Sequence, residues 1–145
     1  MTDITNRPLI CIVDDELTNA EMMRLILDDE YDTCLAYNGK EAIDVISSRK
    51  PDLVLLDIVL PDLSGYEVCK ALKKNPETEN IPIIFVTGLE DKKSESIGLD
   101  AGAIDYVVKP VVSDIVKTRI QRILQTDLYI EFLEKSLDNS KKTVA

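Results

Sequence analysis

The stretch LVLLDIVLP, residues 53–61, is an apolar run of strand length that carries a single carboxylate, Asp57. Burying an ionised carboxylate without a partner is costly, so the strand is expected to end at Asp57, where water, a cation or a donor can reach it. Pro61 favours this interpretation, because proline cannot donate to a strand ladder and is typical of the loop that follows. The alternative is that Asp57 only caps a turn.

The length and charge of the chain exclude several classes of function. Its 145 residues suit one domain with a single core. Lys and Arg number 17 against 27 Asp and Glu, which gives a net charge of −10. This charge repels phosphate backbones and anionic lipid headgroups, so we expect this domain to bind neither nucleic acid nor a membrane. No apolar run approaches the ~18 residues that suggest a membrane span.

Cysteine and histidine usage narrows the chemistry further. Cys11, Cys34 and Cys69 lie far apart in apolar stretches, and the chain has no histidine to complete a zinc site. We therefore expect reduced core cysteines in a cytoplasmic protein. The absence of histidine also excludes a Ser-His-Asp or Cys-His nucleophile and any phosphohistidine carried by this chain.

Five apolar stretches alternate with helical patterns along the chain. The predicted strands are residues 8–13, 31–37, 53–57, 81–86 and 104–108. Helical spacing of apolar residues follows each of them, over residues 17–27, 38–50, 64–75 and 90–101 and from 113 to at least 124. The fourth helix is weak because Ser94, Ser96 and Gly98 lower its propensity, so we expect it to be the most mobile element. The alternation predicts a parallel α/β sheet with right-handed crossovers.

Polar residues follow four of the five predicted strands. Asp14 and Asp15 come after the first strand, Asp57 after the third, Thr87 after the fourth and Lys109 after the fifth. The second strand ends without such a residue, as expected for an edge strand in the order 2-1-3-4-5. Ligands of open parallel sheets bind beyond these carboxyl ends. Singly, each residue could be a helix cap, a strand residue or a surface cation, but their joint position favours a functional site.

The chemistry of this set favours phosphoryl transfer. Three carboxylates beside one lysine leave surplus negative charge, which Mg²⁺ can neutralise because it prefers carboxylate and phosphate oxygens. Lys109 and the Thr87 hydroxyl can then hold phosphoryl oxygens, with the amides of Ile58 and Gly88 as further donors. Asp57 becomes a candidate nucleophile that forms an aspartyl phosphate.

These residues together resemble the receiver domain of response regulators in two-component signalling. The resemblance covers about residues 8–124. It depends on Asp14-Asp15, Leu55-Leu56-Asp57, Pro61 with Ser64-Gly65, Thr87, Ala101-Gly102-Ala103, and Asp105-Tyr106 followed by Lys109-Pro110. It implies a five-stranded parallel sheet in the order 2-1-3-4-5, doubly wound as a flavodoxin-like three-layer sandwich.

The resemblance also implies partners and a cofactor. Asp57 would accept a phosphoryl group from a phosphohistidine on a sensor histidine kinase or a phosphotransfer protein, so the domain itself would not be an enzyme. Mg²⁺ would be held by Asp15, Asp57 and the carbonyl of Val59, and Asp14 would take part in the metal site by orienting metal-bound water.

Two further roles follow from the resemblance and from turn geometry. Thr87 and Tyr106 would form the conformational switch. The Lys109-Pro110 bond is predicted to be cis. The cis isomer costs little free energy before proline, and a turn at a strand end must direct the lysine back over the sheet.

The sequence departs from the family pattern at several positions. Gly88 stands where alanine is usual, and Val111 follows Pro110 where phenylalanine is common. Val59 and Leu89 offer no polar group that could orient a water for attack, so we expect slow self-dephosphorylation.

The residue pattern favours two other functional classes less. A magnesium-dependent phosphohydrolase would also use a strand-end aspartate as nucleophile, but it needs a general acid-base, and Asp57-Ile58-Val59 supplies no second carboxylate. A structural scaffold with a decayed site would have no reason to keep the full set of charges.

Residues 125–145 are expected to form a helical extension of a receiver domain at residues 1–124. Apolar residues recur every seven positions at Val116, Ile123, Ile130 and Leu137, with Ile120, Leu124 and Leu133 beside them. This spacing predicts a helix from Ser113 to about Leu137, through which two chains could pair as a homodimer or pass on a signal. Asp127 and Glu134 interrupt the second row, and the alternative is that the stripe folds back on its own domain. With 35 residues after Pro110, we expect either a single-domain regulator or the front part of a longer protein.

Overall fold

A computed structural model of the chain describes residues 7–88 and 97–143. The strands are β1 (Leu9–Val13), β2 (Asp32–Ala36), β3 (Leu53–Asp57), β4 (Ile83–Thr87) and β5 (Asp105–Val108). The helices are α1 (Leu17–Leu27), α2 (Gly39–Arg49), α3 (Gly65–Lys74) and α5 (Ser113–Thr143). Of the weak helix predicted over residues 90–101, residues 97–100 are helical, and residues 90–96 lie outside the described part.

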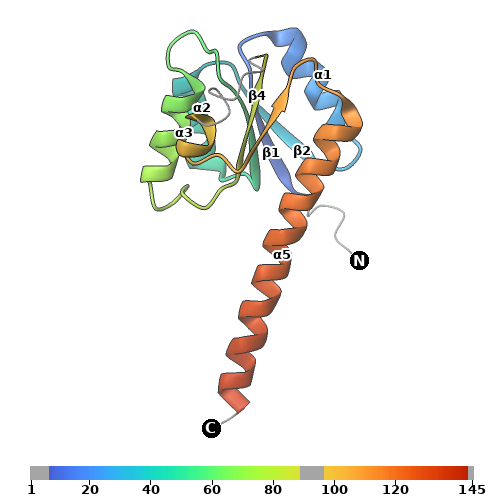
Figure 1. Cartoon of the computed structure of the whole chain (residues 1–145), viewed down its shortest axis with the longest axis vertical. Coiled ribbons are helices and arrows are strands. Elements are labelled where there is room, and N and C mark those ends of the chain that lie inside the picture. Colours follow the sequence, from blue (N-terminus) through green and yellow to red (C-terminus); the bar gives the residue numbers. More distant parts are fainter. Residues whose placement is uncertain (1–6, 89–96, 144–145) are drawn as a thin grey trace.

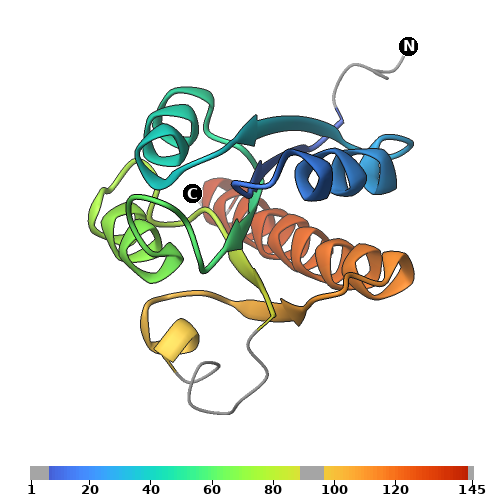
Figure 2. The same ribbon diagram turned by 90° about the horizontal axis from the view of Figure 1, so that it is seen from above.

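The five strands form one parallel sheet in the order β2-β1-β3-β4-β5, as predicted. Helices α2 and α3 cover one face of the sheet, and α1 and α5 cover the other (Figure 2). A hydrophobic core lies on each face of the sheet, and each strand contributes side chains to both cores, because successive side chains point to opposite faces. Cys11 and Val13 pack toward α2 and α3, whereas Ile10 and Ile12 pack toward α1 and α5. The central strands are therefore continuous apolar runs, as the sequence indicated.

Two helices begin at capping side chains, close to the predicted helix starts. Asn38 accepts a hydrogen bond from the amide of Glu41 at 2.8 Å, and Ser64 accepts one from the amide of Glu67 at 3.2 Å. Each side chain satisfies an amide that the helix itself leaves free. These caps fix where α2 and α3 begin relative to the carboxyl ends of β2 and β3.

Gly65 lets α3 begin directly against the end of β3. Its amide donates to the carbonyl of Ile58 at 2.7 Å. A Cβ atom at this position would lie 2.4 Å from the carbonyl oxygen of Asp57 and 2.8 Å from the Cα of Ile58. Only glycine allows this approach, which holds the loop after Asp57 in place.

Helix α5 is longer than predicted, since it runs for 31 residues and ends at Thr143. Its first half packs on the sheet, and its second half continues away from the domain as one rod (Figure 1). The interpretation that the apolar stripe folds back on its own domain is therefore wrong. No described helix is both long and apolar enough to cross a membrane.

We predict that Gly65→Ala destabilises the fold by about 1–3 kcal/mol, because the added methyl group must displace the backbone of β3. Urea unfolding monitored by circular dichroism measures the change. Gly88→Ala is the control, since a Cβ atom there meets no heavy atom within 4 Å. Its stability should stay within about 0.5 kcal/mol of the parent chain. Equal losses in the two variants would show that close packing at Gly65 is not the cause.

Candidate functional site

The predicted site residues come together at the carboxyl edge of the sheet. Asp14 directly follows β1, Asp57 ends β3, Thr87 ends β4 and Lys109 directly follows β5. The strand partners of Asp57 and Thr87 are Val86 and Val108, so the parallel register aligns these ends.

The fourth strand begins and ends later in the chain than predicted. Residues 81–86 were expected, with Thr87 after them, but β4 runs from Ile83 to Thr87 and includes it. Pro82 has no amide proton to donate to a ladder, which explains the later start. Thr87 is consequently a buried strand-end residue rather than a loop residue.

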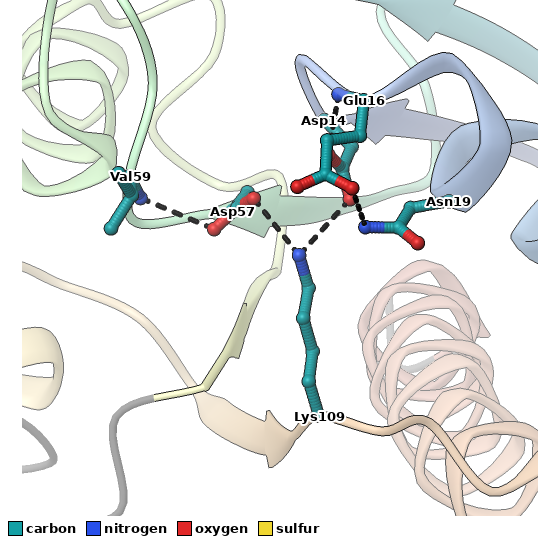
Figure 3. A network of polar contacts seen from close by, with 6 residues as sticks. All are labelled: Asp14, Glu16, Asn19, Asp57, Val59 and Lys109. Carbon is teal, nitrogen blue, oxygen red and sulfur yellow. Dashed lines mark hydrogen bonds and ion pairs between the residues drawn. The ribbon is translucent and has the colours of Figure 1, made fainter.

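Lys109 joins the two buried aspartates across the site. Its Nζ atom lies 3.0 Å from Asp57 Oδ2 and 3.2 Å from Asp14 Oδ2 (Figure 3). Its backbone amide donates to the carbonyl of Thr87 at 2.7 Å, which anchors the turn after β5 to the end of β4. The Lys109-Pro110 bond is cis, as predicted.

Each carboxylate also holds a backbone amide. Asp57 Oδ1 accepts from the amide of Val59 at 3.1 Å, and Asp14 Oδ1 accepts from the amide of Glu16 at 2.9 Å (Figure 3). The Val59 bond brings the loop backbone against Asp57, while the Val59 side chain is exposed. Asp57 is thus oriented by a cation on one oxygen and an amide on the other.

Burial dominates the electrostatics of Asp57. Removal from water raises the pKa of its carboxyl group, and the nearby charge of Asp14 raises it further. Lys109 and the Val59 amide oppose this change without cancelling it. Burial alone would lower the pKa of Lys109, but the bonds and charges of Asp57 and Asp14 outweigh burial and raise it. Lys109 therefore stays a cation in this site.

A third carboxylate completes an acidic cluster. Oxygen atoms of Asp14, Asp15 and Asp57 lie within 4.8 Å of one another, with Asp15 exposed and the other two buried. One lysine cannot balance three carboxylates, so the cluster keeps a surplus of negative charge. An all-oxygen donor set with one solvent-facing member fits a hard divalent cation such as Mg²⁺. Among the described residues this is the group of carboxylates suited to a metal ion.

Thr87 and Tyr106 lie on adjacent strands near the site. Tyr106 pairs with Phe85, two residues before Thr87, and its half-buried ring packs against the core under α2 and α3. Their assignment as the switch stays a prediction.

Three supporting contacts were not predicted. Asn19 donates to Glu16 at 3.0 Å, which steadies the loop after Asp14. Asp62 accepts from the amides of Gly39 and Lys40 at 2.7 and 2.9 Å, which tie the loop after Asp57 to the start of α2. These amide bonds hold the pKa of the Asp62 carboxyl group well below its usual range. No local pattern marks Asp62, because its partners lie more than 20 residues away in the chain.

The third contact is an ion pair between Arg119 of α5 and Asp105 of β5. Arg119 Nη1 lies 2.9 and 2.7 Å from the two oxygens of Asp105. Asp105 Oδ1 also accepts from the amide of Tyr106 at 2.8 Å. The start of β5 is thereby joined to α5, 14 residues further along the chain.

An apolar groove of about 430 Å³ opens beside the site. It lies between α1 and the turn after β5, and Asp14 and Lys109 form its polar end. Met22, Met23 and Ile26 of α1 line much of its wall. Lys109 therefore belongs both to the lining of this groove and to the carboxylate cluster.

Comparison with known proteins decides the family. The model of the response regulator receiver domain matches residues 10–121. The chain belongs to this family. Among solved structures, a CheY-like receiver domain protein from Methanospirillum hungatei has a TM-score of 0.78 and 29% identity, covering 83% of this chain and 96% of that one. A two-component response regulator from Clostridium difficile has a TM-score of 0.77 and 32% identity, covering 82% and 97%.

A longer protein also contains a similar receiver. The chain is 45% identical over 116 residues to a Vibrio cholerae protein named "Probable cyclic di-GMP phosphodiesterase". The match covers 80% of this chain and 26% of that protein. The chain therefore spans about a quarter of the length of this relative.

We predict that Asp57→Asn stabilises the receiver at neutral pH in the absence of metal. A raised native pKa means that the stability of the parent chain falls as pH rises from the ordinary aspartate range through the native value. The neutral amide avoids this penalty, so Tm should rise by roughly 2–4 °C, the shift that about 1 kcal/mol produces. The gain should disappear at acidic pH, where the parent carboxyl group is protonated.

Calorimetry of the two chains across pH measures this difference. Asp44→Asn on α2 is the matched control, because it removes an exposed carboxylate far from the site and should change Tm little. A variant less stable than the parent at neutral pH would mean that the Lys109 ion pair outweighs the burial of Asp57.

Proposed function

We propose that this receiver takes a phosphoryl group from a phosphohistidine onto Asp57 and changes conformation in response. The observation that carries the proposal is the Lys109 ammonium group, 3.0 Å from Asp57 and 3.2 Å from Asp14 within the three-carboxylate cluster. A cation held against a buried carboxylate at a solvent-facing edge suits a step in which negative charge builds up on transferred oxygens.

The proposed reaction is a displacement at phosphorus. An Asp57 oxygen forms a bond to phosphorus while the phosphorus–nitrogen bond of phosphohistidine breaks, and the donor imidazole leaves with the electron pair and takes a proton. The bonds from Lys109 and the Val59 amide orient the Asp57 carboxylate for in-line attack. Its raised pKa makes the carboxylate a better nucleophile than an ordinary aspartate.

Several surrounding residues would bind the oxygens of the transferred phosphoryl group and neutralise its negative charge. Lys109 would bind one phosphoryl oxygen, and the Thr87 hydroxyl, at the end of β4, would bind another; their positions at the carboxyl edge of the sheet support this. Asp15, Asp57 and the Val59 carbonyl are the proposed ligands of Mg²⁺, and Asp14 would take part in the metal site by orienting metal-bound water. The ion would supply neutralisation of the phosphoryl charge when bound.

We further propose that Thr87 and Tyr106 report phosphorylation. Movement of Thr87 toward the phosphoryl group would free space beside its own strand, and the Tyr106 ring lies on the next strand over. Since Tyr106 follows Asp105, which holds Arg119, the change would reach α5 as well.

The donor is proposed to be a sensor histidine kinase or a phosphotransfer protein that docks over α1. Leu17, Met22 and Leu25 are large exposed apolar side chains on this helix, and the groove beside them ends at Lys109. A partner seated there reaches Asp57 from the open edge of the sheet. Three free, buried cysteines support a reduced compartment, and we place the domain in the cytoplasm.

The site favours a regulatory role for this receiver over a role as a phosphohydrolase. A phosphohydrolase needs a general acid-base near its nucleophile, and Val59, two residues beyond Asp57, is apolar. The Vibrio cholerae relative is named a phosphodiesterase, but the match covers 26% of its length. We propose that a segment like this one regulates such a protein, and that catalytic turnover there belongs to the rest of that protein.

We predict one phosphoryl group per chain on incubation with acetyl phosphate and Mg²⁺, measured by intact mass. The adduct should be acid-stable and base-labile, as an acyl phosphate is. Asp57→Asn should remove labelling, and Asp15→Asn should slow it at least about tenfold by weakening metal binding. Asp44→Asn, which removes an exposed carboxylate on α2, should label like the parent chain.

Two outcomes decide between this proposal and its alternatives. Full labelling of Asp57→Asn would exclude Asp57 as the acceptor. Release of many equivalents of product from p-nitrophenyl phosphate, abolished by Asp57→Asn, would instead establish the phosphohydrolase.

A further inference from the structure

Helix α5 keeps its apolar repeat after it leaves the sheet. On the domain, Val116 and Ile120 are 0% exposed and Ile123 is 9% exposed, because the sheet covers them. Beyond the domain, Ile130, Leu133 and Leu137 are 49, 43 and 62% exposed. Within the described part of the chain, nothing covers these three side chains.

The three exposed residues lie on one stripe of the helix. Spacings of three and four residues bring Ile130, Leu133 and Leu137 to the same side. In heptad terms, Ile123, Ile130 and Leu137 take the a positions, and Thr126 and Leu133 take the d positions. Ile123, Ile130 and Leu137 form the seven-residue row expected from the sequence, and Leu133 lies beside it.

We propose that two copies of this chain pair in parallel along the part of α5 that projects from the domain, through Ile130, Leu133 and Leu137. Isoleucine at a and leucine at d favour two-stranded parallel coiled coils. The projecting part of α5 is a single rod (Figure 1), and without a partner this seam would leave an apolar stripe in water over about two turns.

Charge supports a second copy as the occupant. The chain as a whole carries −10, which opposes self-association, but residues 125–145 hold four acidic and three basic residues. The seam segment is thus almost neutral and does not repel its copy. It is also not basic, which argues against a lipid surface.

The seam begins where the domain can influence it. Arg119 lies about two turns before Thr126, and its ion pair with Asp105 joins α5 to β5 beside Tyr106. A shift of β5 would therefore change the direction in which α5 leaves the sheet. This link rests on the proposed function, whereas the dimer itself does not.

Sedimentation velocity of the full chain over a concentration series tests the dimer. The parent chain should sediment as a dimer, and Leu133→Lys or Ile130→Lys should raise the dissociation constant by about 30-fold or more, as loss of an interface hot spot does. Phe132→Lys is the matched control. Phe132 is 63% exposed but lies on the opposite side of α5, so the same change of charge should leave the dimer intact.

Cross-linking tests the orientation independently. Leu137→Cys should form an intermolecular disulfide on mild oxidation, because parallel pairing places position 137 beside itself, and Phe132→Cys should not. A parent chain that stays monomeric at high concentration, or a dimer that survives both lysine substitutions in the seam, would overturn the proposal. A dimer without cross-linking at position 137 would overturn the parallel arrangement. Labelling of Asp57 by acetyl phosphate is measured separately from the dimer. A failure of the proposed phosphorylation can therefore be distinguished from a failure of the proposed dimer.

Discussion

The contact of Lys109 with Asp14 and Asp57 is the interaction on which this edge of the sheet depends. Two buried carboxylates near each other repel, and at an effective dielectric constant of 20 a pair of charges about 4 Å apart interacts by about 4 kcal/mol. The Lys109 ammonium group offsets this repulsion by contacting both. It also joins the turn after β5 to the ends of β1 and β3, neither of which pairs with β5 in the sheet. Removing the cation would leave the repulsion uncompensated.

Lys109 neutralises only part of the negative charge of the three-carboxylate cluster. Asp57 keeps a raised pKa, and Asp15 adds a third carboxylate at the solvent-facing side. A site of this kind suits a cation. Under the proposed function, arrival of a phosphoryl group would change its charge balance, because Lys109 would then have a more highly charged partner. The same feature that limits stability thus makes the site responsive, as expected where buried charge serves function.

Much of the fold followed from local patterns in the sequence. The alternation of strands and helices, the helix starts near Asn38 and Ser64 and the carboxylate-lysine site came from periodicity, from turn residues and from the rule that parallel strands end at one edge. The full strand order came from the resemblance to receiver domains. Contacts between distant segments did not. Asp62 and the Asp105–Arg119 pair carry no local signal, because the sequence does not state which side chains a crossover brings together. The end of α5 was also missed, since its polar final turns lack the apolar repeat that defined the prediction.

The most direct test of the account is the protonation of Asp57 itself. A ¹³C NMR titration of the Asp57 carboxyl carbon, assigned by its loss in Asp57→Asn, measures its pKa in metal-free protein. The account predicts a value above the ordinary aspartate value of about 3.9, and a fall when Mg²⁺ is added, because a bound cation favours the ionised form. A pKa at or below the ordinary value in metal-free protein, unchanged by Mg²⁺, would contradict it.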